Sequence, residues 1–268
     1  MSTLHGKTAI ITGGGSGIGK QIAIRFAEAG ANVMICGRKE AKLQETVAIL
    51  ESKGAEAGYA VCDVTKEDDL KNLVEKTVGR FGTIDILVNN AHGGELPEMK
   101  SVQEGYTTLF SFMEEPVAHY EHYMKGNLYS TINLMQLCIP YMRGKNDASI
   151  INFSSCSSKG LTGVGVGRIA FGTAKGAVAE MSRIAAYELG KEHIRVNIVY
   201  PGCTTDNQAE AFAGHMDAVT QALSRNPLGH CGDPYEDVAP VVVFLASEDS
   251  KFITGSSFYA DGGNWMSM

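Results

Sequence analysis

Short apolar segments rich in β-branched residues alternate with amphipathic helical segments along nearly the whole chain, and this alternation constrains the fold more than any other feature. The first cycle consists of the run Thr8–Thr12, the helical stretch Ile18–Ala29 and a second run at Asn32–Cys36. Such alternation builds βαβ units, whose strands lie parallel in a sheet that helices cover. The pattern predicts an α/β fold with one doubly wound domain, in which about seven parallel strands carry helices on both faces of the sheet.

The same alternation continues to the end of the chain, and no repeat or linker divides residues 1–268 into two domains. Further strands are expected at Tyr59–Cys62, Ile84–Asn89, Ser149–Phe153, Arg195–Tyr200 and Ser256–Ala260, and further helices at Lys39–Lys53, Lys66–Arg80, Ile169–Leu189 and Tyr235–Ala246. Two stretches interrupt the alternation, residues 93–123 and 204–225. Both follow strands at the sheet edge where ligands bind in open α/β folds, so we expect them to form substrate-side loops.

Composition excludes several classes of protein. The chain has 23 Lys and Arg against 30 Asp and Glu, and its net charge of −7 disfavours a nucleic-acid partner. No apolar run approaches the roughly 18 residues of a membrane-spanning helix, and the first residues do not resemble a secretory signal. The six cysteines are widely spaced and form no C-x-x-C pair, which predicts reduced thiols in a cytoplasmic protein.

A glycine-rich turn follows the first expected strand and opens the first expected helix. Its sequence is Thr12-Gly13-Gly14-Gly15-Ser16-Gly17-Ile18-Gly19. Glycine permits a sharp turn and lets the backbone approach a pyrophosphate, whose negative charge is favoured at a helix N-terminus. We therefore expect a Rossmann-type dinucleotide site with phosphate contacts at Gly13, Ser16, Gly17, Ile18 and Gly19.

The end of the second expected strand bears on which dinucleotide binds. An NAD site usually places an acidic residue there to hold the ribose 2′-hydroxyl. This chain has Gly37-Arg38-Lys39 instead, without a carboxylate. Because Arg38 would favour a 2′-phosphate, NADP(H) is the expected cofactor and NAD(H) is the alternative, in which Arg38 only stacks on the adenine.

Several motifs in order along the chain resemble those of the short-chain dehydrogenase/reductase family. The first is the spacing Thr12-Gly13-x-x-x-Gly17-x-Gly19, and Asn89-Asn90-Ala91 matches the family motif N-N-A-G except that His92 replaces the glycine. Asn127 and the pair Ser154-Ser155 resemble catalytic motifs, and Asp261-Gly262-Gly263 matches a late signature. The resemblance implies further cofactor contacts at Asp63, Val64, Asn90, Lys175, Pro201, Gly202 and Thr204.

The resemblance also implies a proton relay, and one of its members is changed in this chain. In the family a serine bonds the substrate oxygen, a tyrosine transfers its proton, a lysine one helical turn later lowers the phenol pKa, and an asparagine anchors a water. The motif Y-x-x-x-K reads Phe171-Gly172-Thr173-Ala174-Lys175 here. Phenylalanine has no hydroxyl, and losing a positioned general acid typically costs about 10²–10⁴ in rate. We therefore expect catalytic positions at Asn127, Ser155, Phe171 and Lys175 in an inactive or strongly impaired enzyme.

Three interpretations of Phe171 remain open. The first is an engineered Tyr-to-Phe substitution, which the retention of Asn127, the serines and Lys175 favours. The second is a natural pseudoenzyme that binds nucleotide without turnover. The third is a reductase whose proton donor comes from elsewhere, as in family members resembling dienoyl-CoA reductases.

The position of the catalytic serine is a separate question. Motif matching selects Ser155, directly after an expected strand, provided that residues 160–167 hold the extra length before Phe171. Raw spacing from Phe171 selects Ser158 instead, and Ser157 lies between them. We favour Ser155 because the end of the strand marks the edge where the nicotinamide lies in this family.

The first expectation for the substrate is a bulky apolar alcohol or ketone, with other secondary alcohols, sugars and acyl thioesters as alternatives. The interval between Asn89 and Asn127 is longer than the family commonly has, which suggests a deep, partly lidded pocket. The segment Arg168-Ile169-Ala170 resembles bacterial hydroxysteroid dehydrogenases that act on bile acids. His92 is a substrate-side candidate, whereas His119 and His122 lack a matched third ligand, so no metal site is expected. The resemblance further implies a homotetramer or dimer built through helices near 127–142 and 171–189 and the C-terminal segment.

Overall fold

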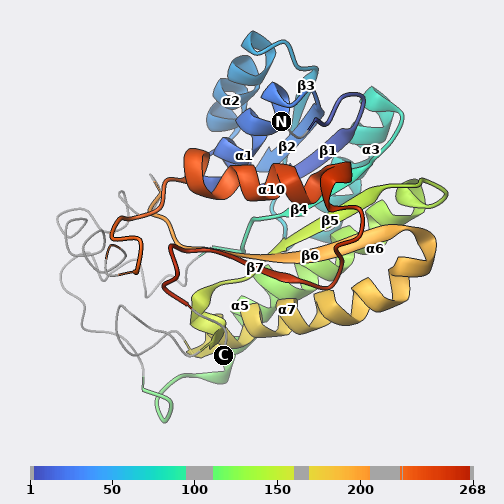
Figure 1. Ribbon diagram of the computed structural model, residues 1–268. Coiled ribbons are helices and arrows are strands. Elements are labelled where there is room, and N and C mark those ends of the chain that lie inside the picture. The colour runs from blue at the N-terminus through green and yellow to red at the C-terminus, as the bar shows by residue number, and fades with distance from the viewer. Residues whose placement is uncertain (1–2, 95–110, 160–168, 206–223, 225, 266–268) are drawn as a thin grey trace.

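Seven parallel strands form one sheet in the order β3-β2-β1-β4-β5-β6-β7 (Figure 1). The computed structural model describes residues 3–94, 111–159, 169–205, 224 and 226–265. Within these ranges the strands are β1 Thr8–Thr12, β2 Asn32–Gly37, β3 Ala57–Val61, β4 Ile86–Asn89, β5 Ala148–Phe153, β6 Ile194–Pro201 and β7 Ser257–Ala260. The chain moves outward from β1 to β3 and then returns to β4 beside β1, so the topological switch point lies between β1 and β4. The predicted doubly wound, all-parallel α/β fold is confirmed.

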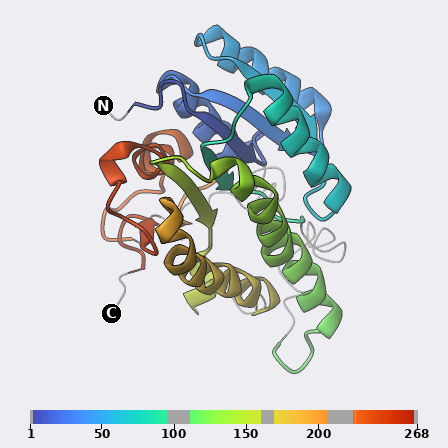
Figure 2. The same ribbon diagram turned by 90° about the vertical axis from the view of Figure 1, so that its right-hand side faces the viewer.

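Helices cover both faces of the sheet, and each face has its own apolar core (Figures 1 and 2). Helices α1 (Gly17–Glu28), α2 (Glu40–Ser52) and α10 (Ala239–Ala246) pack on one face. Helices α3 (Glu67–Phe81), α6 (Ser130–Met142) and α7 (Ile169–Leu189) pack on the other. Because both faces are covered, β1, β4 and β5 are buried along their whole length. In the described part of the chain no helix combines the length and the apolar character needed to cross a bilayer.

Most helices and strands begin and end within about two residues of the expected positions, as is usual for element boundaries. The main difference lies in the stretch 93–123, which was expected to be a loop. Its last residues form helix α5 (Val117–Met124), which continues through one π-helical turn, η2 (Lys125–Tyr129), into α6. The helix expected at 235–246 likewise begins with a π-helical turn, η5 (Pro234–Val238). Residues 95–110 and nearly all of 204–225 lie outside the described ranges.

Buried ion pairs hold the amino-terminal edge of the sheet. Arg195 at the start of β6 bonds Asp147 at 3.1 Å, with side chains only 7% and 9% exposed. The Asp85 carboxylate accepts the Thr8 N–H at 2.8 Å and pairs with Lys145. Each buried charge at this edge therefore has an opposite charge beside it.

Candidate active site

The glycine-rich turn occupies the switch point, between the end of β1 and the start of α1. Gly13 and Gly17 have positive φ angles of 72° and 53°, which glycine adopts without strain. A Cβ atom at Gly13 would lie 2.8 Å from Asn90 Nδ2, and one at Gly19 would overlap the Gly13 carbonyl oxygen. Ser16 caps α1 with an extended backbone. The turn is thus packed so closely that only glycine fits, while the N-terminus of α1 remains beside it.

The Thr12 side chain ties this turn to the end of β4. Its hydroxyl donates to the Val88 carbonyl at 3.3 Å and accepts the N–H groups of Asn90 and Ala91 at 3.0 and 2.9 Å. Asn90 Nδ2 returns a hydrogen bond to the Thr12 carbonyl at 2.9 Å. Sequence reasoning identified Asn90 but not the Thr12 hydroxyl, although the polar residue at the end of an apolar strand was a usable signal.

Arg38 follows β2 and reaches across to the loop after β4. Its guanidinium nitrogens lie 3.2 and 3.3 Å from the place that a Gly94 Cβ would take. Its charge also acts on the Asp63 carboxylate. Burial acts to raise the Asp63 pKa, but hydrogen bonds from the Thr65 N–H and hydroxyl, with the charges of Arg38 and Lys66, outweigh it and lower the pKa. Arg38 therefore lies between the loop after β4 and the acidic residue that follows β3.

Asn127 lies inside the π-helical turn η2 and is 1% exposed. Its Nδ2 donates to the Tyr123 carbonyl at 2.8 Å, while its buried Oδ1 has no hydrogen-bond partner among the described residues. The backbones of Gly93 and Gly126 cross so closely that a Cβ at Gly93 would lie 2.7 Å from the Gly126 Cα. The π turn is therefore fixed against the loop after β4, and π turns of this kind are frequent at functional sites.

Lys175 is buried on α7 with a side chain that faces the end of β5. Its Nζ donates to the Phe153 carbonyl at 2.9 Å, and no salt bridge to it occurs within the described ranges. Burial lowers the Lys175 pKa to about 8. A lysine with this pKa exchanges a proton readily near neutral pH.

Phe171 lies one helical turn before Lys175, and its ring is 5.9 Å from Lys175 Nζ. Two polar aromatic side chains approach this ring edge-on. The His92 ring centroid lies 6.4 Å away at 77°, and the Tyr123 centroid lies 5.5 Å away at 72°. Tyr123 was missed in the sequence, although its position four residues before Asn127 places both on one helical face.

The serines after β5 differ in what their hydroxyls do. Ser154 donates to the Lys175 carbonyl at 2.9 Å, and Ser158 donates to the Ser155 carbonyl at 2.7 Å. The Ser155 hydroxyl accepts the Ser157 N–H at 3.3 Å, and no bond that it donates occurs within the described ranges. Ser155 thus keeps a hydroxyl hydrogen for another acceptor. The extra residues expected at 160–167 lie outside the described ranges.

The ends of β6 and β7 meet at the same edge of the sheet. The Gly202 N–H donates to the Ala260 carbonyl at 2.8 Å, and a Cβ at Gly202 would lie 2.5 Å from the Asp261 Cα. Thr204 follows, with its hydroxyl 3.6 Å from Cys231 Sγ. The expected cofactor contacts Pro201 and Gly202 and the late motif Asp261-Gly262-Gly263 therefore pack on each other, and they continue the row of strand ends that begins with the glycine turn.

The histidines outside this row form other contacts. His119 Nδ1 bonds Glu115 Oε1 at 2.9 Å, and His122 Nε2 donates to the Gly94 carbonyl at 3.0 Å. Within the described residues no group of three or more His, Cys, Asp or Glu side chains is arranged to hold a metal ion. All six cysteines are free thiols.

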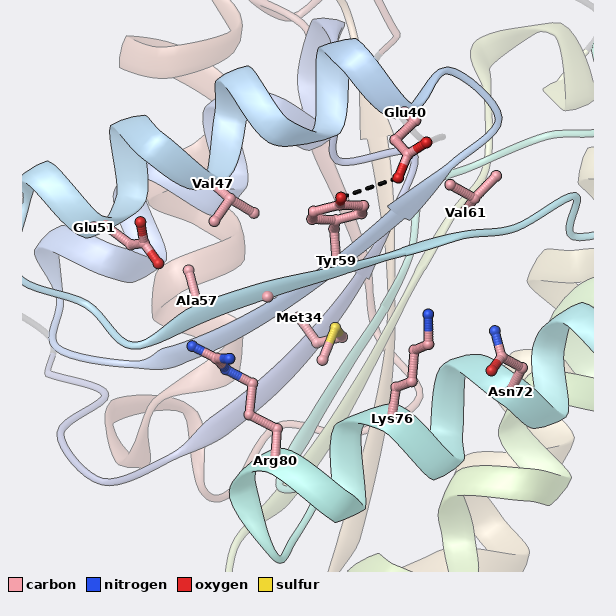
Figure 3. A pocket seen from close by; sticks show the side chains of 11 residues that line it. Met34, Glu40, Val47, Glu51, Ala57, Tyr59, Val61, Asn72, Lys76 and Arg80 are labelled. Atoms are coloured by element: carbon pink, nitrogen blue, oxygen red, sulfur yellow. Dashed lines mark hydrogen bonds between the residues drawn. The ribbon is translucent and has the colours of Figure 1, made fainter.

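Two surface grooves lie away from the row of strand ends. One, of about 680 Å³, runs along the edge strand β3 between α2 and α3 and is lined by Tyr59, Lys76 and Arg80 among others (Figure 3). Glu40 accepts a hydrogen bond from the Tyr59 hydroxyl there. A second groove, of about 330 Å³, lies between Val64 and the π turn η2. Neither groove is lined by Lys175 or Phe171. The candidate active site is therefore identified from its side chains at the strand ends, and these grooves are not part of it.

The fold and this row of side chains define a Rossmann-type α/β protein with a dinucleotide-type turn at the switch point. Comparisons with known proteins identify relatives that match nearly the whole chain. A family model described as enoyl-(acyl carrier protein) reductase matches residues 13–264. A 12alpha-hydroxysteroid dehydrogenase from Clostridium sp. is 35% identical over 98% of this chain and 98% of that protein. A 3-oxoacyl-(acyl-carrier-protein) reductase from Thermotoga maritima is 35% identical over 97% of this chain and 98% of that protein.

A solved structure agrees with these relatives. It is a 7 alpha-hydroxysteroid dehydrogenase complexed with NADH and 7-oxo glycochenodeoxycholic acid, with a TM-score of 0.84 and 30% identity over 97% of this chain and 95% of that chain. The chain belongs to the short-chain dehydrogenase/reductase family, a family of oxidoreductases, as the sequence motifs indicated. Hydroxysteroid dehydrogenases are among its relatives, in agreement with the resemblance at residues 168–170.

Proposed function

We propose that the protein is an NADP(H)-dependent oxidoreductase that interconverts a secondary alcohol and a ketone on a bulky apolar substrate, with turnover impaired by Phe171. One observation carries the proposal: the glycine turn and Ser155 follow the carboxyl ends of β1 and β5, the Lys175 amine bonds the last residue of β5, and the turn that holds Asn127 packs on the loop after β4. In open α/β folds this is the edge where ligands bind.

The residues of this edge fit a nicotinamide dinucleotide. The backbone at Gly13, Ser16, Gly17, Ile18 and Gly19 would hold the pyrophosphate, with Asp63 and Val64 toward the adenine and Asn90, Lys175, Pro201, Gly202 and Thr204 toward the nicotinamide half. A dinucleotide bound there supplies or accepts a hydride at the substrate carbon. Arg38 supports NADP(H) because it is a cation directly after β2, at the place where an NAD site usually has an acidic residue. Tighter binding of NAD(H) than of NADP(H) would contradict this preference.

The chain's own residues then act on the substrate oxygen and on the proton. Ser155 is the proposed hydrogen-bond donor to the oxygen, because the hydroxyls of Ser154 and Ser158 already donate to carbonyls. Lys175, with its lowered pKa, holds the exchangeable proton. The buried Asn127 Oδ1 has no hydrogen-bond partner among the described residues, so it can accept a hydrogen bond from a water molecule. This water would connect Lys175 to bulk solvent. Phe171 leaves a gap in this relay because it carries no hydroxyl.

An apolar wall supports the choice of substrate. Tyr123, Ala170 and Ala174 form a buried cluster against which Tyr120, Met124 and Phe171 pack. A flat hydrocarbon skeleton such as that of a steroid or bile acid would lie against the partly buried members of this cluster, as suggested by the hydroxysteroid dehydrogenases among the relatives. We propose that residues 93–123 and 204–225 complete the pocket on the substrate side.

Exposed apolar side chains support self-association. Tyr129 and Tyr141 on the η2–α6 segment and Ile184 and Tyr187 on α7 are each more than 40% exposed. These helices are the ones through which the family resemblance implies a homotetramer or dimer. Sedimentation of the purified chain would test this part of the proposal.

The decisive experiment restores the missing hydroxyl. A Phe171→Tyr variant and the unmodified chain are each given NADPH and a panel of steroid and bile-acid ketones, with small sugars as controls. A gain of about 10²–10⁴ in turnover on a steroid ketone is the expected result. Equal activity in both forms would favour a proton donor elsewhere, and inactivity of both with intact cofactor binding would favour a nucleotide-binding pseudoenzyme.

A further inference from the structure

Strand β3 forms one edge of the sheet and pairs only with β2. The Cys62 N–H, directly after β3, donates to the Gly37 carbonyl of β2 at 2.9 Å. Because successive residues of a strand direct their backbone groups to opposite sides, every second residue before Cys62 also bonds β2. The N–H and C=O groups of the residues in between, Ala57, Tyr59 and Val61, therefore point outward from the sheet.

The outward backbone is open along the second half of the strand. Ala57 is 1% exposed, whereas Val61 is 44% exposed and Tyr59 is half-buried. Beyond the strand, the Asp69 carboxylate accepts the Asp63 N–H at 2.8 Å and so closes this edge. Among the described residues no other backbone group bonds the outward groups of Tyr59 or Val61. A short length of unpaired backbone remains, of the kind to which a further strand can be added.

The two walls of the groove along this edge carry opposite charges (Figure 3). Helix α2 contributes Glu40 and Glu51, and helix α3 contributes Lys76 and Arg80. All four side chains belong to exposed residues. Glu51, Lys76 and Arg80 form no ion pair within the part of the chain that the structure describes. An occupant of the groove would therefore meet carboxylates on the α2 face and cations on the α3 face.

The side chains beside the edge are held on the two faces of the sheet. The Tyr59 hydroxyl donates to Glu40 at 3.0 Å and accepts a hydrogen bond from Gln44 at 3.1 Å, which fixes the ring against α2. On the other face Gly58 has no side chain, and Arg80 Cδ lies 3.2 Å from the place that a Gly58 Cβ would take. Tyr59 thus lies on the α2 face and the aliphatic part of Arg80 on the α3 face.

The charges distinguish between two occupants of the edge. A second copy of the chain would extend the sheet by antiparallel pairing of the two β3 strands about a two-fold axis perpendicular to the sheet. That axis would place α2 beside α2 and α3 beside α3, so that like charges would face each other on both faces. A separate peptide avoids this repulsion, because its side chains alternate between the two faces and can differ in charge.

We propose that the β3 edge binds an extended peptide segment of another protein, in which basic and acidic residues alternate. The peptide backbone adds a strand to the sheet through the outward groups of Tyr59 and Val61. Its basic side chains meet the carboxylates of α2, and its acidic side chains meet the cations of α3. The groove lies outside the candidate active site, so this proposal does not depend on the proposed function.

The first test uses the unmodified chain and the acetylated, amidated peptide Lys-Glu-Lys-Glu-Lys-Glu. Saturable binding with a Kd below about 1 mM is expected. The block peptide Lys-Lys-Lys-Glu-Glu-Glu has the same composition and charge and should bind at least about tenfold more weakly. The backbone amide resonances of Tyr59 and Val61 should shift on binding. Absence of binding, equal affinity for the two peptides or unshifted resonances would each overturn the proposal.

Methylation of the peptide nitrogens separates strand addition from attraction between charges alone. Only every second N–H of an added strand faces β3. Methylation of that set should weaken binding by at least about tenfold, whereas methylation of the other set should leave most of the affinity. The sensitive set also reports whether the peptide lies parallel or antiparallel to β3. Equal effects of the two methylated peptides would overturn the proposal.

Variants of the chain test the protein side of the interface. Val61→Pro removes an outward N–H but no bond to β2, a place where edge strands tolerate proline, and should weaken peptide binding by about tenfold. Lys76→Glu should weaken it by about fivefold. Lys71→Glu makes the same charge change on α3 outside the groove and is the matched control. Equal losses in the two lysine variants, or full affinity in Val61→Pro, would overturn the proposal.

Two further outcomes are decisive. Unfolding curves show whether Val61→Pro folds, and if it does not, Lys76→Glu and the methylated peptides still decide the question on folded protein. Sedimentation tests the other occupant. Self-association of the unmodified chain that Val61→Pro abolishes would assign the edge to a second copy and overturn the proposal.

Discussion

The two edges of the sheet differ in whether their buried charged side chains have partners of opposite charge. At the amino-terminal edge, Arg195 meets Asp147 and Lys145 meets Asp85. At the carboxyl-terminal edge, Lys175 is buried with only the Phe153 carbonyl as its bonded partner, and the Asn127 Oδ1 has none in the described part of the chain. The ion pairs of the first edge favour the charged forms of their side chains, whereas Lys175 at the second edge can release or accept a proton.

This difference assigns a role to each edge. A buried charge with its partner removed is costly, so the paired edge acts as a structural clamp on the ends of the strands. A buried amine without a carboxylate has a lowered pKa, which suits proton exchange and is typical of functional sites. Stability is therefore expected to depend most on the first edge and chemistry on the second.

The largest effect is expected from breaking the clamp. Arg195→Met leaves the Asp147 carboxylate buried without its guanidinium and removes the donors to the Leu245 and Ser247 carbonyls. Unfolding by denaturant should show a loss of about 3–5 kcal/mol, with dinucleotide affinity of the folded protein preserved. Lys71→Met, which breaks an exposed pair with Glu67, is the control and should change little. Similar stability of the two variants would refute the clamp.

The next effect concerns the pH dependence of stability at the unpaired edge. Burial lowers the Lys175 pKa from 10.5 to about 8. Between these values the unfolded chain binds more protons than the folded one, so the burial penalty is complete below pH 8 and is relieved as the pH rises to 10.5. The unmodified chain should gain up to about 3 kcal/mol over this window relative to Lys175→Met. Parallel curves of unfolding free energy against pH would contradict the assignment.

A smaller effect distinguishes the crowded turn from an ordinary helical glycine. Gly19→Ala places a Cβ against the Gly13 carbonyl oxygen and should cost about 1–3 kcal/mol, with weaker dinucleotide binding. Gly79→Ala on α3 meets no atom within 4 Å and should stabilise the protein by about 0.5–1 kcal/mol. Thermal unfolding and dinucleotide titration of both variants check the pair. Loss of stability in Gly79→Ala would contradict the prediction, because this glycine has no neighbouring atom that an added Cβ could meet.

Much of the fold could be predicted because its signals are local. The helix at 169–189 was placed without error, since a long apolar periodicity lies within one segment. Helix α5 was not expected, because His119, Glu121 and His122 make it polar and its buried face is apparent only against α7. The π turn at Asn127 was also unforeseen. It packs against the loop after β4 through Gly93 and Gly126, and such a contact between residues distant in the sequence has no local signal.

The sequence by itself determined the parallel α/β class, the glycine turn and the absence of a hydroxyl at Phe171, because each depends on residue type and on neighbours along the chain. Only the tertiary structure decided which groups surround that missing oxygen. His92 comes from the end of β4, Tyr123 and Asn127 come from the α5–η2 segment, and Lys175 comes from α7. These segments meet because parallel strands bring their carboxyl ends to one edge, and the crossing of two glycine backbones there is a matter of three-dimensional packing.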